Sequence, residues 1–360
     1  MLEKTISLER KAIIITGCAG FIGAALTEEL LKRDDGIQII GIDNMNDYYE
    51  VSLKEYRLKK IQDMMPMVSG TFTFLKGNIA DKKFVNAVFK QYSPDIVINL
   101  AAQAGVRYSI DHPDVYIESN IIGFYNILEA CRHSIEQRKN GIEHLVYASS
   151  SSVYGNNKKI PYEVEDKTDC PVSLYAATKK ADELLAYSYA KLYRIPMTGL
   201  RFFTVYGPAG RPDMAYYSFA DKMVQKREIR LFNYGNCKRD FTYIDDIVGA
   251  IRLVAQSSPL ADSNGVRYKV YNIGNGEPVN LLDFVHILAG ELKKTSVLDR
   301  KYSVENYIEL VGMQPGDVEI TYADVSALES DFGFRPSTNL QEGLCEFAKW
   351  YSSFYEKQGE

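Results

Sequence analysis

The stretch IIITGCAGFIGAALTEELL, residues 13–31, joins an apolar strand to a helix through a turn rich in glycine. Gly17, Gly20 and Gly23 recur at every third position of that turn. Glycine permits a tight turn, a close approach of the backbone to a pyrophosphate, and close packing of helix on strand. The stretch therefore predicts a dinucleotide site, although a glycine triplet alone also fits a purely structural turn.

The segments that follow alternate between strand and helix, as expected for a parallel sheet. Short apolar runs predict strands at residues 12–16, 37–42, 72–77, 95–101, 144–149 and 197–203. Helical patterns lie near residues 22–33, 81–91, 113–133 and 174–193. Strands rich in Ile and Val, alternating with helices, are typical of sheets covered on both faces. We therefore predict an α/β fold with a doubly wound parallel sheet of the Rossmann type.

The alternation ends near residue 204, after which the chain is richer in loops. Two segments there still have helical patterns, FTYIDDIVGAIRLVAQ and LLDFVHILAGEL. We predict a dinucleotide-binding Rossmann domain over residues 1–203 and a smaller, mainly substrate-binding lobe over residues 204–360. The second part is expected to interleave with the first and to be able to return strands to the main sheet.

Composition and charge argue against several classes of function. The chain has 360 residues and a formal net charge of −5, without a basic arm, so nucleic acid is not an expected partner. No apolar run reaches the roughly 18–20 residues that a membrane span needs, and MLEKTISLERK lacks the apolar centre of a signal peptide. The expected location is the cytoplasm. The five cysteines and four histidines are scattered, so we expect neither disulfides nor a metal site.

Polar and small residues follow the predicted strands where a cofactor would lie. Asp43 ends the second strand, where a carboxylate can accept a hydrogen bond from a ribose 2′-hydroxyl and would repel a 2′-phosphate, which favours NAD over NADP. Ala101 and Ala102 leave room for the dinucleotide, although simple packing explains them equally well. The residues predicted to contact NAD are Gly17, Gly20, Phe21, Ile22, Gly23, Asp43, Asn44, Asn78, Ile79, Ala101, Ala102, Tyr175, Lys179 and Phe202.

Candidate catalytic groups lie after the cofactor strands. Tyr175 and Lys179 are four residues apart in a helical stretch, so their side chains share one face. A free tyrosine has a pKa of about 10, but a nearby ammonium and a positive nicotinamide ring favour the phenolate, which can act as a base. The fifth strand ends in ASSSSVYG, residues 148–155, at the edge where the cofactor crevice opens. Chance spacing and a polar turn remain the structural interpretations of these two motifs.

Over almost its whole length the chain resembles the extended short-chain dehydrogenase/reductase family. The matching motifs are TGCAGFIG, GIDN, NLAAQAG, ASSSSVYG, the YxxxK at 175–179 and RDFTYIDD at 239–246. This resemblance implies that Ser150, Tyr175 and Lys179 are the catalytic residues and that Ser152 touches the sugar. It also implies a homodimer that pairs the helices near 113–133 and 174–193, although core packing explains their apolar faces as well.

Within that family, longer stretches look like the subgroup of UDP-glucuronate 4-epimerases. These are GIDNMNDYYEVSLKEYRL, LAAQAGVRYSI, RFFTVYGPAGRPDMAY and MQPGDVEITYAD. The resemblance implies an NAD-dependent isomerase that interconverts UDP-glucuronate and UDP-galacturonate through a 4-keto sugar without decarboxylation. The residues expected to bind the UDP-sugar are Arg107, Ser150, Ser152, Thr204, Arg211, Arg239 and Asp317. Of these, Thr204 and Arg211 are expected to hold the sugar carboxylate, Arg239 the diphosphate and Asp317 the uridine ribose.

Neighbouring activities of the family differ at the end of the fifth strand. Related decarboxylases carry Glu, and related 4,6-dehydratases an Asp–Glu pair, where this chain has Ser151 and Ser152. Neither reaction is therefore expected. The departures from the subgroup are Cys18 in the glycine turn and Ala209, where a bulkier residue is usual. Two alternatives stay open: a 4-epimerase of another UDP-hexose or UDP-N-acetylhexosamine(uronate), and a non-catalytic NAD-binding sensor. The stretch NDYYEVSLKEY has no assigned role.

Overall fold

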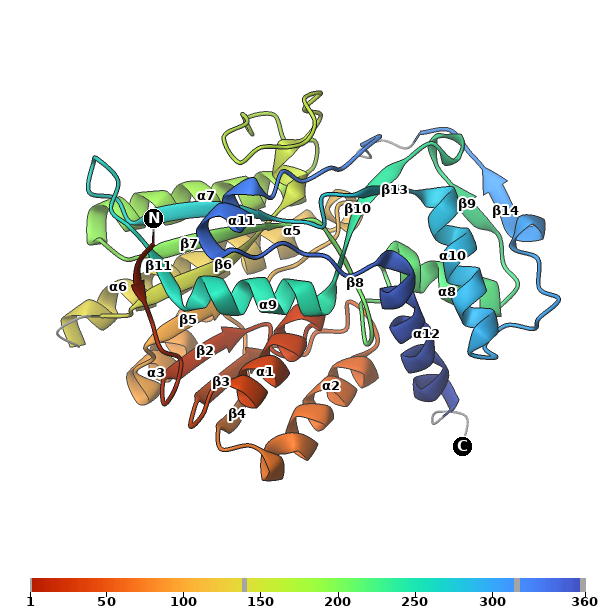
Figure 1. Ribbon diagram of the computed structural model, residues 1–360. Helices are drawn as coiled ribbons and strands as arrows, with labels where there is room; N and C mark the ends of the chain where they lie inside the picture. Colours follow the sequence, from red (N-terminus) through yellow and green to blue (C-terminus); the bar gives the residue numbers. More distant parts are fainter. Residues whose placement is uncertain (1, 138–140, 314–317, 357–360) are drawn as a thin grey trace.

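The computed structural model describes residues 2–137, 141–313 and 318–356. Its centre is a parallel sheet in the order β12–β7–β6–β5–β2–β3–β4 (Figure 1). The strands are β2 (Ala12–Thr16), β3 (Gln38–Asp43), β4 (Thr71–Lys76), β5 (Ile96–Asn99), β6 (His144–Ser150), β7 (Met197–Phe202) and β12 (Tyr268–Ile273). The expected doubly wound sheet is confirmed, and its seventh strand comes from the second half of the chain.

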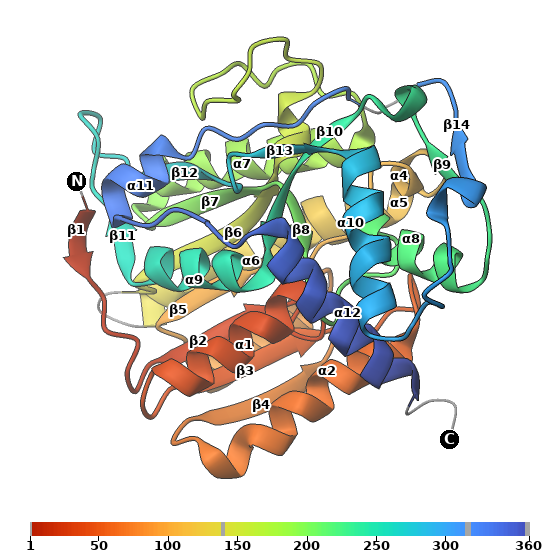
Figure 2. The same ribbon diagram turned by 45° about the vertical axis from the view of Figure 1, so that its right-hand side comes forward.

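Helices cover both faces of this sheet (Figures 1 and 2). On one face lie α1 (Phe21–Arg33), α2 (Val51–Met64) and α9 (Ile244–Ala255), and on the other α3 (Lys82–Tyr92), α6 (Gly123–Gln137) and α7 (Leu174–Tyr193). The helix expected over 113–133 is not one regular α-helix. It comprises α5 (Pro113–Tyr116), a π-helical turn η2 (Ile117–Ile122) and then α6. Periodicity alone could not separate these segments because a π-turn displaces the pattern by a single residue.

The second half of the chain adds short strands and helices beside the carboxyl ends of the sheet. The strands are β8 (Thr204–Tyr206), β9 (Ile229–Leu231), β10 (Lys238–Tyr243), β13 (Pro278–Asn280) and β14 (Ile308–Leu310). The helices there are α8 (Ala215–Val224), α10 (Leu281–Lys294) and α12 (Leu340–Glu356), whereas α11 (Ser326–Phe332) packs against β12, where Asp331 accepts a hydrogen bond from the Tyr271 hydroxyl. A further pair, β1 (Leu2–Thr5) with β11 (Ser257–Pro259), joins the start of the chain to the second half. The division at residue 203 stays a prediction, and α9 and β12 beyond it belong to the sheet layers.

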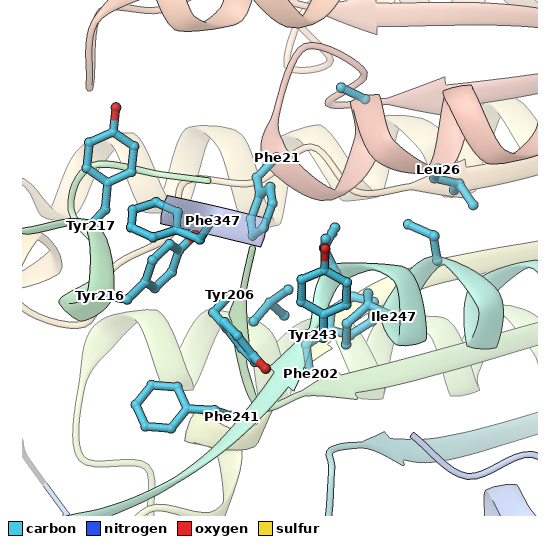
Figure 3. Packing of buried hydrophobic residues seen from close by; sticks show 14 of the residues in the cluster. Phe21, Leu26, Phe202, Tyr206, Tyr216, Tyr217, Phe241, Tyr243, Ile247 and Phe347 are labelled. Atoms are coloured by element: carbon cyan, nitrogen blue, oxygen red, sulfur yellow. The ribbon is translucent and has the colours of Figure 1, made fainter. Parts of the chain in front are cut away.

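A buried aromatic cluster connects the two halves (Figure 3). Phe21 at the start of α1, Tyr206 on β8, Tyr216 on α8 and Phe347 on α12 all belong to it. The Tyr206 and Tyr216 ring centroids lie 6.3 Å apart, and those of Tyr216 and Phe347 lie 5.0 Å apart, both edge to face. Edge-to-face contacts add to the free energy gained by removing these large rings from water. The helix that follows the glycine turn and the C-terminal helix therefore share one core.

In the part of the chain that the structure describes, no helix combines the length and the hydropathy that crossing a membrane requires.

Candidate active site

A cavity of about 990 Å³ lies along the carboxyl ends of the sheet strands and extends to the second-half elements. Every predicted site residue that the structure describes lines it. These are Gly17, Gly20, Phe21, Ile22, Gly23, Asp43, Asn44, Asn78, Ile79, Ala101, Ala102, Arg107, Ser150, Ser152, Tyr175, Lys179, Phe202, Thr204, Arg211 and Arg239. Asp317 lies outside the described residues. The fold thus brings together side chains from many separate motifs, while the role of each stays a prediction.

In the glycine turn, side chains at Gly17 and Gly23 would clash with neighbouring backbone atoms. Gly17 has φ +72°, and a Cβ added to it would lie 2.8 Å from the backbone nitrogen of Ala101. A Cβ on Gly23 would lie 2.1 Å from the Gly17 carbonyl oxygen. The turn therefore brings bare backbone to the N-terminus of α1, whose first amide N–H groups have no partner within the helix. This cradle fits the pyrophosphate of a dinucleotide.

Asp43 lies beside that turn at the end of β3. Its carboxylate accepts hydrogen bonds from the backbone N–H of Ala19 at 3.2 Å and of Met45 at 2.9 Å. The side chain also lines the cavity. A carboxylate fixed in this way has the chemistry to accept a hydrogen bond from a ribose hydroxyl, and that role stays a prediction.

Lys179 is held at the foot of the cavity by two groups. Its ammonium donates to the Ala148 carbonyl oxygen at 3.0 Å and to Asp182 Oδ2 at 3.2 Å. The side chains of Lys179 and Asp182 are each only 2% exposed, and Asp182 Oδ1 has no hydrogen-bond partner among the described residues. Burial raises the pKa of Asp182 to about 7, although the neighbouring ammonium opposes this. Sequence reasoning missed Asp182, which lies one helical turn after the lysine on the same side.

The serine cluster follows the end of β6. Ser150 Oγ accepts hydrogen bonds from the hydroxyl of Ser152 at 2.9 Å and from its backbone N–H at 3.2 Å. The chain then turns through η3 (Ser151–Tyr154). Nearby, the ring of Tyr175 meets that of Tyr116 edge to face at 6.0 Å. Ser150 therefore carries an oriented hydroxyl on the wall that Tyr175 also lines.

The predicted carboxylate-binding arginine is already paired. Arg211 Nε donates to Asp213 Oδ1 at 3.0 Å and its Nη2 donates to Oδ2 at 2.6 Å. The hydroxyl of Tyr48 donates to the same Oδ2 at 3.2 Å. Burial raises the pKa of Asp213, but the guanidinium outweighs it and the net pKa lies below its usual value. Sequence reasoning missed both Tyr48 and Asp213; only the RPD spacing offered a signal for the second.

Arg57 on α2 gives the stretch NDYYEVSLKEY and its helix a structural role. Its guanidinium donates to the carbonyl oxygens of Ala209 and Gly210, each at 2.9 Å, and to that of Ala19 at 2.9 Å. It also donates to the Tyr49 hydroxyl at 2.7 Å. A buried guanidinium is stable only when its donors are satisfied in this way. Arg57 thus ties the glycine turn to the loop that carries Arg211.

Several further cationic side chains line the cavity. Arg239 donates to the carbonyl oxygens of Lys238 at 2.9 Å and Glu319 at 3.2 Å. The Arg107 guanidinium lies 4.8 Å from the Phe232 ring centroid. Lys222 and Arg230 line the cavity as well, and side chains of this charge suit a diphosphate. Among the described residues no cluster of His, Cys, Asp and Glu could hold a metal ion.

The sequence model of the family described as GDP-mannose 4,6 dehydratase matches residues 14–347. The chain belongs to this family. The family is part of the extended short-chain dehydrogenases/reductases, so the resemblance drawn from the motifs is confirmed.

Relatives of the chain include curated proteins that match almost its whole length. Protein CapI of Staphylococcus aureus is 49% identical over 96% of this chain and 99% of its own length. UDP-glucuronate 4-epimerase 4 of Arabidopsis thaliana is 43% identical over 95% of this chain and 76% of its own. A crystal structure of UDP-glucuronic acid 4-epimerase from Bacillus cereus, in complex with UDP-glucuronic acid and NAD, superposes with a TM-score of 0.79. It is 29% identical, over 96% of this chain and 100% of that one.

Proposed function

We propose that the protein is an NAD-dependent 4-epimerase that interconverts UDP-glucuronate and UDP-galacturonate without loss of carbon dioxide. Its relatives and structural neighbours support the coarser statement, an NAD-dependent UDP-sugar 4-epimerase. The finer statement depends on one observation. Arg211 and Thr204 line the same cavity as Ser150, Tyr175 and Lys179, so the proposed carboxylate-binding group shares a cavity with the proposed catalytic set.

The catalytic residues have complementary tasks in this proposal. The glycine turn and Asp43 would hold NAD, which would supply the hydride acceptor and donor for C4 of the sugar. Tyr175 as a phenolate takes the proton of the C4 hydroxyl and afterwards gives it back. Lys179 favours the phenolate by its charge, and Ser150 orients the reacting oxygen. Between the two steps the 4-keto sugar turns about its link to the diphosphate.

When the sugar is a uronic acid, the 4-keto intermediate can also lose carbon dioxide. With a ketone at C4 and a carboxylate on C5, the bound sugar is a β-keto acid. If the C5–carboxylate bond aligns with the carbonyl π system, it breaks and its electron pair passes into the ketone. Carbon dioxide then leaves, and the resulting enolate takes a proton at C5. An arginine that holds the carboxylate away from this alignment preserves all six carbons, and Arg211 is the proposed group.

The acidic side chains of the cavity argue against dehydration and decarboxylation as the main reactions. In the described part of the cavity wall these are Asp43, Asp111 and Asp213, with no glutamate. Asp213 is paired with Arg211, and its lowered pKa keeps it ionised rather than able to donate a proton. The Glu183 carboxylate is tied to Arg201 at 2.8 Å and does not line the cavity. Ser151 and Ser152 occupy the wall instead.

Incubation of the purified protein with UDP-glucuronate, followed by proton NMR, tests the proposal. UDP-galacturonate is expected to appear and to approach a constant ratio with the substrate, while no carbon dioxide is released. A pentose product would contradict the proposal, and so would turnover of UDP-glucose with none of UDP-glucuronate.

One observation favours a second candidate, a 4-epimerase of another UDP-hexose or UDP-N-acetylhexosamine(uronate). Asp213 already neutralises Arg211, so this wall of the cavity also tolerates a neutral sugar. Comparison of UDP-glucuronate with UDP-glucose and UDP-N-acetylglucosamine as substrates separates the two candidates.

Replacing Asp182 by Asn is expected to raise kcat/KM relative to the native protein above about pH 7 and to change it little below that pH. Removal of this carboxylate leaves the Lys179 charge uncompensated, which stabilises the Tyr175 phenolate. Since the pKa of Asp182 lies at about 7, its ionisation opposes the phenolate in the native protein mainly above that pH. The ratio of kcat/KM between variant and native protein, followed from pH 5 to 9, measures the change. An unchanged ratio above pH 7 in a folded variant would contradict this role.

The protein is further proposed to form a homodimer through the exposed apolar side chains of η2, α6 and α7. These are Ile117, Ile122, Tyr125, Leu184 and Tyr187. Exposed apolar side chains on elements that contact one another, as these three do, are typical of an interface. Analytical ultracentrifugation is expected to give a dimer for the native protein and a monomer for Leu184→Glu. A monomeric native protein at micromolar concentration would contradict the proposal.

A further inference from the structure

We infer that Tyr48 and Asp213 are positioning residues that fix Arg211 in the one orientation in which it protects the sugar carboxylate. The inference rests on the proposed function and deepens it. Neither residue is expected to contact the reacting C4 atom. Each acts through the guanidinium that they hold together.

The first step concerns the two edges of the guanidinium. An arginine can bind carboxylates along its side edge, which includes Nε, and along its end edge, formed by the two Nη groups. Asp213 occupies Nε and Nη2, and Nη1 takes no part in this pair. A substrate carboxylate therefore meets the end edge, and the planar fork can no longer turn about its long axis.

The second step concerns Tyr48, which fixes Asp213 in turn. Burial and the nearby Asp213 raise the pKa of Tyr48, so its hydroxyl stays protonated and donates. The Tyr48 ring packs edge to face on Tyr108 at 4.7 Å. Gly105 has φ +104°, and a Cβ there would lie 2.7 Å from the Tyr48 hydroxyl oxygen. The NLAAQAG loop therefore leaves the space that this hydroxyl needs.

The third step concerns the backbone on which Arg211 is mounted. The Arg57 guanidinium donates hydrogen bonds to the carbonyl oxygens of Ala209 and Gly210, the two residues directly before Arg211. Arg57 and Tyr48 both come from the segment that includes the start of α2. That segment thus fixes Arg211 in two ways. Arg57 holds the backbone before Arg211, and Tyr48 holds its counter-ion Asp213.

The carboxyl group needs restraint only while the sugar is a 4-ketone, so the orientation of Arg211 affects the fate of the intermediate more than the binding of substrate. A loose arginine still attracts the carboxylate, but it lets the C5–carboxylate bond rotate toward alignment with the ketone. Asp213 also offsets part of the attraction between Arg211 and the substrate. Its removal is therefore expected to leave KM unchanged or to lower it, while more of the intermediate loses carbon dioxide.

The experiment compares Tyr48→Phe and Asp213→Asn with two matched controls remote from the cavity, Tyr92→Phe and Asp63→Asn. Each protein is incubated with UDP-glucuronate carrying carbon-13 in its carboxylate, and labelled carbon dioxide is measured against UDP-galacturonate formed. The ratio is expected to rise about tenfold for Asp213→Asn, as for the loss of a charge-assisted hydrogen bond. It should rise less for Tyr48→Phe and not at all for the controls.

The possible failures are distinguishable. If the native protein converts UDP-glucuronate cleanly and both variants keep its ratio, the inference is wrong and the proposed function stands. If the native protein does not act on UDP-glucuronate, the proposed function fails, and the inference fails with it. Should Asp213→Asn not fold, Tyr48→Phe decides alone, because it keeps the ring and loses only the hydroxyl.

Discussion

Replacing Arg211 by glutamine is expected to lower kcat/KM for UDP-glucuronate by about 100-fold and to release carbon dioxide from part of the sugar that still reacts. The variant loses the bidentate, charge-assisted contact that is proposed between Arg211 and the carboxylate, which accounts for a change of this order. It also removes the restraint on the β-keto acid. Initial rates by coupled assay, with NMR of the products, measure both effects.

The control for this variant is Arg33→Gln, a change of the same type on an exposed ion pair of α1. It is expected to keep native rates. If Arg211→Gln retains full activity on UDP-glucuronate, the carboxylate is not bound there. The second candidate, an epimerase of neutral or N-acetylated sugars, would then be favoured.

Replacing Tyr175 by phenylalanine is expected to lower kcat by about a thousandfold while NAD remains bound. The change removes the group that is proposed to accept and return the C4 proton, and general acid–base groups contribute effects of this size. The ring itself remains and can keep its edge-to-face contact with Tyr116. Stopped assays measure the rate, and the NAD released on denaturation measures cofactor content.

Native turnover by Tyr175→Phe would favour the non-catalytic NAD-binding sensor among the alternatives. The same substitution at Tyr92, at the end of α3, tests whether loss of a hydroxyl alone disturbs the protein. It is expected to change neither rate nor cofactor content.

The sequence predicted what short-range patterns encode. A run of apolar residues predicted each sheet strand of the first half. The turn was predicted from Gly17 and Gly23, because its backbone leaves no room for a Cβ at either position. The sequence also predicted that the motifs after the strands lie close together, because the carboxyl ends of parallel strands meet at one edge of a sheet. These inferences need only local spacing and the handedness of the connections.

The support of Arg211 could not be predicted because it depends on distant pairs. Tyr48 and Asp213 are 165 positions apart in the chain, and Arg57 and Ala209 are 152 apart. No periodicity marks either pair. Asp182 escaped notice for another reason: a carboxylate on a helix ordinarily faces solvent, and only the structure places this one beside Lys179 in the interior.

The aromatic cluster of Figure 3 couples the unfolding of the two halves of the protein. Because Phe21 and Phe347 belong to one continuous interior, melting either half uncovers apolar rings of the other. The chain should therefore lose its structure in a single cooperative transition. A fragment that ends at residue 203 would expose part of that interior to water and should aggregate rather than fold into an independent cofactor-binding unit.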